Sequence, residues 1–355
     1  MRKEEILNKY ICLLNSNKEV FIYGARICGE YVYKYLTDNN IKVKCFVDDD
    51  ECFVGKTVKG VNVYPSSIID NTNAVVVVAA VHCMYEISSK LKNKGFKNII
   101  PFFILTLQNL NISDFCQFYD NLFDDYIENK NKYHNLFNIF KDELSKKTLD
   151  VLIQFRETYD WSLFAKVSQY YRNQYFDFFN YNNDVFVDGG CFDGDTTEQF
   201  IGLNKKYKKV YAFEPDPVSF KKVQVNLQKY NNINIFDKGL SDKQEILAFN
   251  ALGDADSSFN EHGNSKVETV CLDDIVTEEK AFIKLDVEGF EYKTICGARR
   301  LISNNSKLAV ALYHHPYDLW QIPELILSIN KNYDFYLRHY SNTIFDTVIY
   351  AIPNV

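Results

Sequence analysis

The sequence predicts an α/β protein in which two Rossmann-like, doubly wound sheets are joined by a helical connector. Short apolar runs alternate with helix-like segments in two separate series, and a glycine turn follows the first run of each series. Between the two series, residues 104–180 contain neither glycine nor proline. We therefore expect a small Rossmann-like domain over residues 1–103, a helical connector over 104–180 and a second α/β domain over 181–355.

The first domain and the connector are predicted from the spacing of apolar residues. Residues 74–81 form a continuous apolar run, which is typical of a strand buried on both faces of a parallel sheet. In the connector, Phe137, Phe140 and Leu144 recur at three- and four-residue spacings, which indicates helices. The strands expected in the first domain are 20–23, 43–47, 74–81 and 98–100, and the helices are 28–36 and 85–94.

The second domain repeats this alternation and ends differently. We expect five parallel strands with helices between them, followed by two antiparallel strands that form a terminal hairpin. The expected strands are 185–187, 209–213, 234–236, 282–285, 308–313, 333–338 and 347–351, and the expected helices are 196–203, 218–229, 292–303 and 323–330.

The composition argues against several classes of protein. A formal net charge of −7 disfavours a nucleic-acid partner, because phosphate binding needs a basic surface. The nine cysteines form no Cys-x-x-Cys pair, so we expect reduced thiols and neither a zinc ribbon nor a thioredoxin-type site. The N-terminus lacks the apolar core of a signal peptide, and no apolar run is long enough to span a membrane. These features predict a cytoplasmic protein.

The clearest functional signal is the turn after the first strand of the second domain, which reads VDGGCFDGDT from residue 187. Its glycines let the backbone approach a ligand closely, and three aspartates surround them. The aspartates would repel a pyrophosphate, whereas S-adenosylmethionine (AdoMet) has no phosphate and carries a sulfonium and an ammonium group. The acidic turn therefore favours AdoMet over NAD. The residues expected to contact the cofactor here are Asp188, Gly189, Gly190, Asp193, Asp195 and Thr196.

Further polar positions follow the next two strands. Glu214 ends the second strand, about 25 residues after the glycine turn, and can accept hydrogen bonds from both ribose hydroxyls. After the third strand, Asp237 or Ser241 could bind the exocyclic amine of the adenine. A glycine motif alone is weak, but three such positions in chain order, each at the end of its own strand, are much harder to obtain by chance.

Six segments of the second domain carry a family resemblance: FVDGGCFDGDTTEQF, YAFEPDPVSF, KGLSD, FIKLDVEGFE, GARRLI and LRHY…TVIYA. Over residues 185 to about 352 the chain resembles the FkbM family of methyltransferases. The resemblance implies a class I methyltransferase fold, dependence on AdoMet and, for many members, O-methylation of sugars or other hydroxyls. The pair Gly190-Cys191 departs from the family, in which an alanine is common there. The first domain looks like the small Rossmann-type domains that accompany nucleotide-sugar-modifying enzymes.

Methyl transfer is an in-line displacement, so the groups that act on the acceptor should lie beside the cofactor, where the fourth and fifth strands end. Alternation along the fourth strand places Lys284, Asp286 and Glu288 on one side, and Asp286 is also expected to contact the cofactor. After the fifth strand, His314 matches the family position and is preferred to His315 as general base. The alternative for the charged triplet is a lysine–carboxylate pair that only closes the end of the sheet.

Other roles for these and later residues are open. Asp286, Glu288 and His314 would also suit a divalent metal, but nothing in the sequence requires one and none is predicted. Contacts with the substrate are expected from residues before the first strand, after the fifth strand and on the late hairpin, namely Tyr175, Asp177, His315, Arg338 and His339.

The glycine turn of the first domain has different chemistry. It keeps the first and last glycines of the GxGxxG pattern, Gly24 and Gly29, and carries Arg26 at the middle position. Asp48, at the end of the next strand, is placed to bind a ribose. The guanidinium predicts a phosphate-bearing ligand such as a nucleotide sugar. The alternative is a fold relic used for packing or dimerisation.

The sequence thus predicts an AdoMet-dependent methyltransferase that acts on a hydroxyl of a sugar, a glycan or a nucleotide-linked precursor. N-methylation of an amino sugar or amino-acid substituent is an alternative within the same class. A non-catalytic nucleotide-sugar-binding or scaffold protein and a nicotinamide oxidoreductase are alternatives from other classes. The sequence is compatible with a homo-oligomer.

Overall fold

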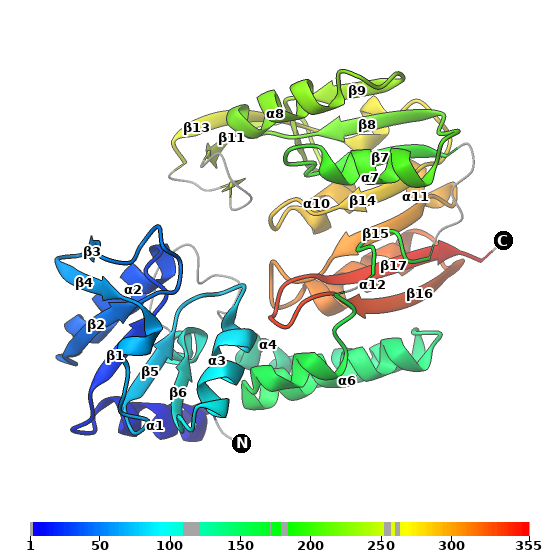
Figure 1. Cartoon of the computed structure of the whole chain (residues 1–355). Helices are drawn as coiled ribbons and strands as arrows, with labels where there is room; N and C mark the ends of the chain where they lie inside the picture. Colours follow the sequence, from blue (N-terminus) through cyan, green and yellow to red (C-terminus); the bar gives the residue numbers. More distant parts are fainter. Residues whose placement is uncertain are drawn as a thin grey trace. The chain divides into compact units, whose positions relative to one another are not determined.

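The computed structural model describes residues 3–108, 121–170, 172–178, 184–251, 257–259 and 263–354. The chain forms two compact units, drawn together in Figure 1. The boundary between them passes through helix α6 (Glu143–Thr158), so the expected connector is divided between the two units. Of that connector, residues 109–120, 171, 179 and 180 lie outside the described residues. Unit 1 comprises Met1–Asn129, Asp150–Ser168 and Ser341–Ile344, and unit 2 comprises Lys130–Leu149, Gln169–Tyr340 and Phe345–Val355.

Unit 1 is built on a six-stranded sheet with the order β3-β4-β2-β1-β5-β6. All neighbouring strands are parallel except β3 and β4, a short antiparallel pair that no apolar run in the sequence predicted. The central strands β1 and β5 are buried along their whole length, as their apolar runs predicted. The strands are β1 (Val20–Tyr23), β2 (Val43–Val47), β3 (Thr57–Val58), β4 (Val61–Tyr64), β5 (Val75–Val78) and β6 (Asn98–Pro101).

The helices of unit 1 include one that the sequence analysis did not predict, α1 at the N-terminus. The α-helices are α1 (Lys3–Leu14), α2 (Ile27–Asp38), α3 (Met84–Asn93), α4 (Leu122–Glu128) and the C-terminal part of α6. Short 3-10 helices cover Ser66–Ile68, Phe102–Gln108 and Trp161–Lys166.

Unit 2 contains a seven-stranded sheet with the order β16-β17-β15-β14-β7-β8-β9 (Figure 1). The five strands from β15 to β9 are parallel, and β17 and β16 add an antiparallel hairpin at one edge. This is the α/β architecture that the sequence predicted. The strands are β7 (Val185–Gly189), β8 (Lys209–Phe213), β9 (Ile233–Phe236), β14 (Phe282–Leu285), β15 (Lys307–Ala311), β16 (Tyr333–His339) and β17 (Thr347–Pro353).

A second, four-stranded sheet in unit 2 was not predicted. Its order is β10-β13-β11-β12, with a parallel pair and two antiparallel pairs. The strands are β10 (Gly239–Leu240), β11 (Glu245–Asn250), β12 (Ser258–Phe259) and β13 (Ser265–Val270). Strands β10 and β12 are only two residues long, and β11 and β12 are mostly half-exposed, so the sheet lacks the buried apolar run that marks the main sheet.

The predicted helices of unit 2 are present with shifted ends, and α9 was not predicted. Helix α12 begins at Asp318, so Pro323 lies inside it and is not its first residue. The predicted helix 292–303 is divided into α10 and α11. The α-helices are α5 (Lys130–Asn135), the N-terminal part of α6, α7 (Asp195–Leu203), α8 (Pro217–Leu227), α9 (Leu272–Ile275), α10 (Glu291–Cys296), α11 (Arg299–Ser303) and α12 (Asp318–Ile329). A 3-10 turn covers Leu136–Asn138.

Aromatic packing holds the main sheet of unit 2 against its first helix. Phe186 in β7 stacks on Phe200 of α7 with ring centroids 4.2 Å apart, and on Phe282 of β14 at 5.2 Å. All three rings are buried. Burial of these rings fixes the start of α7, and with it the glycine turn between β7 and α7.

Two expectations from composition can be compared with the described residues. Among them, no helix combines the length and apolar character needed to cross a membrane. No disulfide joins the eight cysteines that lie in the described ranges, and Cys116 lies outside them.

Candidate active site

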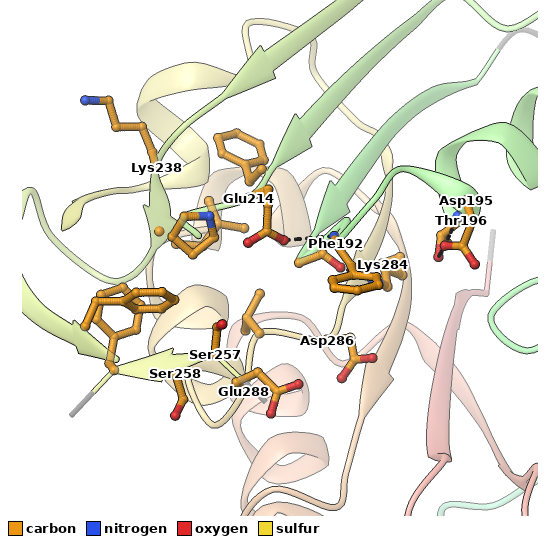
Figure 2. A pocket seen from close by; sticks show the side chains of 18 of the residues that line it. Phe192, Asp195, Thr196, Glu214, Lys238, Ser257, Ser258, Lys284, Asp286 and Glu288 are labelled. Atoms are coloured by element: carbon orange, nitrogen blue, oxygen red, sulfur yellow. Dashed lines mark hydrogen bonds between the residues drawn. The ribbon is translucent and has the colours of Figure 1, made fainter. Parts of the chain in front are cut away.

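A cavity of about 230 Å³ opens in unit 2 at the carboxyl ends of β7, β8 and β14. The chain proceeds from β7 to β8 and β9 on one side and later to β14 and β15 on the other, so this is the switch point of the sheet. Figure 2 shows carboxylates and aromatic rings around the same hollow. The predicted residues that line it are Tyr175, Gly190, Asp195, Thr196, Glu214, Lys284, Asp286 and Glu288.

Glycine at position 190 is required by the close approach of two backbones. Gly190 has a φ of 73°, and a Cβ atom on it would lie 1.8 Å from the carbonyl oxygen of Asp286. Gly194, with a φ of 92°, forms the N-cap of α7. Both residues have left-handed backbone conformations, which residues with a Cβ atom rarely adopt. The glycine turn therefore brings β7 against the end of β14, where the other candidate residues lie.

Lys284 and Asp188 form a buried ion pair behind this turn. The Lys284 Nζ lies 3.1 Å from Asp188 Oδ1 and donates hydrogen bonds to the carbonyls of Gly189 and Gly190 at 3.2 and 2.6 Å. Asp188 also accepts a hydrogen bond from the Thr197 hydroxyl. Burial lowers the pKa of Lys284, but Asp188 and Asp286 outweigh it and raise that pKa, so the lysine stays charged. Its charge serves to hold the turn, although its side chain also reaches the cavity wall.

Glu214 lies at the cavity with both carboxylate oxygens engaged. Oε2 accepts a hydrogen bond from the amide of Phe192 at 2.8 Å (Figure 2), and Oε1 accepts one from the amide of Asp216 at 2.8 Å. Burial raises the pKa of Glu214 to about 7, and the two amide donors offset part of that rise. The bond to Phe192 ties the end of β8 to the glycine turn.

Asp286 is oriented by two tyrosines. Tyr175 donates to Oδ2 at 2.8 Å, and Tyr313 donates to Oδ1 at 2.9 Å. Burial opposes ionisation of Asp286, but nearby His314 and Lys284 and the two hydroxyls outweigh it and lower its pKa. Asp286 is therefore a charged, fixed carboxylate at the cavity wall.

His314 lies behind the wall, surrounded by acids. Its Nδ1 is 2.8 Å from Glu291 Oε1, and its Nε2 is 3.4 Å from Glu288 Oε2 and 3.5 Å from Asp286 Oδ1. Burial lowers the pKa of His314, but Glu291 and Glu288 outweigh it and raise the pKa well above its usual value. Burial also raises the pKa of Glu288 to about 7. Asp286, Glu288 and His314 could together hold a metal ion, since one ligand atom of each lies within 4.8 Å of the others.

The remaining predicted residues of unit 2 are not among those that line the cavity. His315 contacts the carbonyl of Gly289, and Ser241 is buried beside Asp242. The side chain of Asp193 accepts a hydrogen bond from the amide of Asp195, and the Asp237 side chain is 67% exposed. The predicted residues outside the lining are Asp188, Gly189, Asp193, Asp237, Ser241, His314, His315, Asp177, Arg338 and His339.

Three of the predicted substrate residues have internal partners instead. Arg338 and His339, expected to contact substrate from the late hairpin, lie on that hairpin but are buried. Arg338 is hydrogen-bonded to Ser145 of α6 and to Asp142, which directly precedes that helix. His339 is hydrogen-bonded to Thr347. Asp177 accepts a hydrogen bond from Tyr340. Packing against segments distant in the sequence explains the positions of Arg338 and Asp177, whereas His339 pairs with Thr347 across the β16–β17 hairpin.

Several cavity residues were not predicted as site residues. The aromatic part of the wall comes from Phe192, Phe213, Phe249 and Phe259, of which the last two belong to the unpredicted second sheet. Tyr313 and Glu291, which orient Asp286 and His314, were also missed. Tyr313 immediately precedes His314, and Glu291 follows Glu288 by three residues, so proximity to the ends of β14 and β15 was the available signal.

The glycine turn of unit 1 is held by its own neighbours. The carboxylate of Asp48 accepts a hydrogen bond from the amide of Ala25 at 2.9 Å, and Arg26 forms an ion pair with Asp50 at 2.9 Å. A Cβ atom on Gly29 would lie 2.0 Å from the carbonyl oxygen of Gly24. The packing of helix α2 on the turn therefore explains Gly29, whereas Gly24 has a φ of 112° and lies against the backbone of Ala79 and Ala80.

The seven-stranded sheet with a cavity at its switch point has the fold of the class I methyltransferases, for which AdoMet is the implied methyl donor. Residues 188–337 match the model of the methyltransferase FkbM domain. The second unit thus carries an FkbM methyltransferase domain, and the protein is an enzyme.

One solved structure has the same fold over nearly the whole chain, and others match about half of the chain at low TM-scores. The structure of the methyltransferase FkbM from Methylobacillus flagellatus KT has a TM-score of 0.80 at 22% identity, over 98% of this chain and 93% of that chain. Precorrin-6y C5,15-methyltransferase from Geobacter metallireducens GS-15 has a TM-score of 0.30 at 16% identity, over 49% of this chain and 80% of that chain. A SAM-dependent methyltransferase from Aquifex aeolicus has a TM-score of 0.33 at 13% identity, over 55% of this chain and 98% of that chain. No curated protein matches the chain.

Proposed function

We propose that unit 2 binds AdoMet in this cavity and transfers its methyl group to a hydroxyl of a sugar or glycan precursor. The observation that carries the proposal is the charge of the cavity. Glu214, Asp286 and Glu288 line it together. The charge of Lys284 is taken up by Asp188 and the turn carbonyls, and that of Lys238, which also lines the cavity, is paired with Glu268. A cofactor that carries a sulfonium and an ammonium, and no phosphate, is complementary to such a cavity.

The residues of the wall suit the parts of AdoMet. Glu214 would accept hydrogen bonds from the ribose hydroxyls, because a carboxylate at this strand end has that role in related folds. The rings of Phe213, Phe249 and Phe259 offer an apolar surface for the adenine. The bare backbone at Gly190 allows the methionine part to approach the end of β14. Asp188, Gly189 and Asp193 would act on the cofactor only by shaping the turn.

In the transfer, the acceptor oxygen attacks the methyl carbon, the carbon–sulfur bond breaks, and the electron pair remains on sulfur to give S-adenosylhomocysteine. The acceptor proton must leave as the bond forms. Asp286 and Glu288 lie at the cavity wall with His314 behind them, so this cluster can orient the acceptor hydroxyl and receive its proton. Lys284 is proposed as a positioning residue for the turn.

The same carboxylates favour a second acceptor. An amino sugar would be attracted to Asp286 and Glu288 as the ammonium form and methylated on nitrogen after loss of a proton. A phosphate-linked acceptor is disfavoured near this wall for the same electrostatic reason.

Isothermal titration with AdoMet and with S-adenosylhomocysteine tests the cofactor. We expect saturable binding to wild-type protein and weaker binding to Glu214→Gln. A folded wild-type sample that binds neither compound would refute the proposal. Incubation with AdoMet and candidate sugars or amino sugars, followed by acid hydrolysis and mass spectrometry, distinguishes methylated oxygen from methylated nitrogen.

A further inference from the structure

We propose that Asp286, Glu288 and His314 form a binding site for a divalent cation of the Mn²⁺ or Zn²⁺ class at the wall of the cavity. The three residues come from the ends of the adjacent strands β14 and β15, and one ligand atom of each lies within 4.8 Å of the others. Asp286 and Glu288 line the cavity, and Figure 2 shows their side chains on the same side of it. His314 is almost completely buried behind them.

The distances within the cluster suit a shared ion. The Nε2 atom of His314 lies 3.5 Å from Asp286 and 3.4 Å from Glu288. Both distances exceed the roughly 2.9–3.0 Å that is usual for an N–H···O hydrogen bond. Atoms that bind one ion at about 2.0–2.4 Å lie roughly 3.0–3.5 Å from each other. The spacing thus resembles that of ligands around a cation.

The proposed ligands are held from behind, as metal ligands usually are. Glu291 lies 2.8 Å from Nδ1 of His314, which directs Nε2 towards the two carboxylates. Tyr175 and Tyr313 each donate a hydrogen bond to Asp286. Glu291 also accepts hydrogen bonds from the amides of Val287 and Gly289, and so fixes the loop that carries Glu288.

The charge of the cluster points the same way. Three carboxylates, those of Asp286, Glu288 and Glu291, surround a single imidazole, and Glu291 is fully buried. A divalent cation would neutralise Asp286 and Glu288 and bind the neutral imidazole at Nε2. A mixed set of one nitrogen and two carboxylates suits Mn²⁺ or Zn²⁺ better than Ca²⁺ or Mg²⁺, which prefer oxygen ligands.

Such an ion would be open towards the cavity, because the protein ligands approach it from the opposite side. Its free positions could bind one or two hydroxyls of the acceptor, which lowers the pKa of a bound hydroxyl and lets its proton pass to water. This role rests on the proposed methyl transfer, whereas cation binding itself does not.

Titration of metal-free wild-type protein with MnCl₂, followed by the electron paramagnetic resonance signal of free Mn²⁺, tests the site. We expect the protein to remove one equivalent of Mn²⁺ from the signal, and ZnCl₂ to release it. Glu288→Gln should weaken binding at least about tenfold, because it removes a ligand of a three-residue site. Glu288 is partly exposed, so this variant is expected to fold. An unchanged signal with wild-type protein would overturn the proposal.

Two further variants separate ligation from general charge. Asp195→Asn removes one negative charge from the same cavity without removing a proposed ligand, and should bind Mn²⁺ like the wild type. Glu291→Gln removes the charge behind His314 and should weaken binding roughly 10–100-fold. Equal weakening by Asp195→Asn and Glu288→Gln would contradict the assignment.

Titration of the same samples with S-adenosylhomocysteine distinguishes the two proposals. Binding of S-adenosylhomocysteine without Mn²⁺ binding would overturn the cation site alone. Binding of Mn²⁺ without S-adenosylhomocysteine would support the cation site and refute the proposed cofactor pocket.

Discussion

The glycine turn that follows β1 in unit 1 and the one that follows β7 in unit 2 are built alike. In each, a carboxylate from the end of the neighbouring parallel strand accepts a hydrogen bond from an amide of the turn. Asp48 binds the amide of Ala25 at 2.9 Å, and Glu214 binds that of Phe192 at 2.8 Å. In each, one glycine is required because a Cβ would strike a backbone carbonyl.

The turns differ in what the surrounding strand ends contribute. In unit 1, Asp49 is bound by Tyr23, Lys90 and the amide of Ser66, and Asp50 is paired with Arg26. In unit 2, Glu214, Asp286 and Glu288 line a common cavity. A glycine turn thus specifies a backbone shape, and the side chains at the ends of adjacent strands decide whether a ligand can be bound there.

The largest effect is expected from Gly190→Ala. The added Cβ would lie 1.8 Å from a backbone carbonyl, and no side-chain rotation can relieve that contact. We expect a loss of more than about 4 kcal/mol in the free energy of unfolding, together with loss of AdoMet binding. Gly202→Ala in α7 is the control, because no atom lies within 4 Å of its Cβ, and it should stabilise by roughly 0.5–1 kcal/mol. Urea unfolding measures both, and similar results for the two variants would contradict the steric argument.

The next largest loss of stability is expected from removing the buried charge of Lys284. Lys284→Met leaves Asp188 without its ion pair in the interior, and should destabilise the protein by about 3–5 kcal/mol. Lys90→Met breaks the pair with Asp49 in unit 1, where both side chains are more than 40% exposed, and should cost about 0–1 kcal/mol. Thermal and urea unfolding of both variants test the contrast. A loss near zero for Lys284→Met would show that the pair does not hold the turn.

Replacing Glu214, the carboxylate at the end of β8 in unit 2, should have an effect of intermediate size on cofactor affinity. At about pH 8, above the pKa of about 7 of Glu214, Glu214→Gln keeps the shape of the side chain but replaces a charged acceptor, and should weaken S-adenosylhomocysteine binding by about 1.5–3 kcal/mol. Asp48→Asn, the matching change in unit 1, should leave the affinity unchanged. Isothermal titration measures both. If Asp48→Asn weakened binding as much, the assignment of the cofactor to the turn of unit 2 would be wrong.

The smallest effect concerns pH. The pKa of Glu214 is about 7 in the folded protein and lies near its ordinary value of 4.5 when the chain is unfolded. Between these values the folded protein binds the proton that the unfolded chain releases, so this residue lowers stability as pH rises towards 7, with no further loss above it. Affinity for S-adenosylhomocysteine should instead rise through pH 7, as the ionised carboxylate becomes the better acceptor. The difference between wild type and Glu214→Gln in titrations at pH 6 and 8, values chosen to bracket that pKa, isolates this contribution.

The predictions that succeeded depended on local patterns. The run at Val75–Val78 and the turn at Gly190 are encoded in adjacent residues, so the main sheets and the turn beside the cavity were predictable. The second sheet of unit 2 was not predictable, because β11 pairs with β13 across an intervening segment and most residues of β11 and β12 are half-exposed. Arg338 was expected near the substrate. Its actual partner on α6, Ser145, lies almost 200 positions away in the sequence, so no local pattern could indicate that contact.

By itself, the sequence determined the two alternating series, the glycine turns, and the acids that end β8 and β14, because backbone conformation and strand burial follow from neighbouring residues. Tertiary structure alone decided that Lys284 forms an ion pair with Asp188 and that Tyr175 and Tyr313 both donate hydrogen bonds to Asp286. It also decided that Glu291 lies behind His314. These outcomes depend on which strand ends become neighbours, and hydrogen bonds and charges act over a few ångströms of space regardless of their separation along the chain.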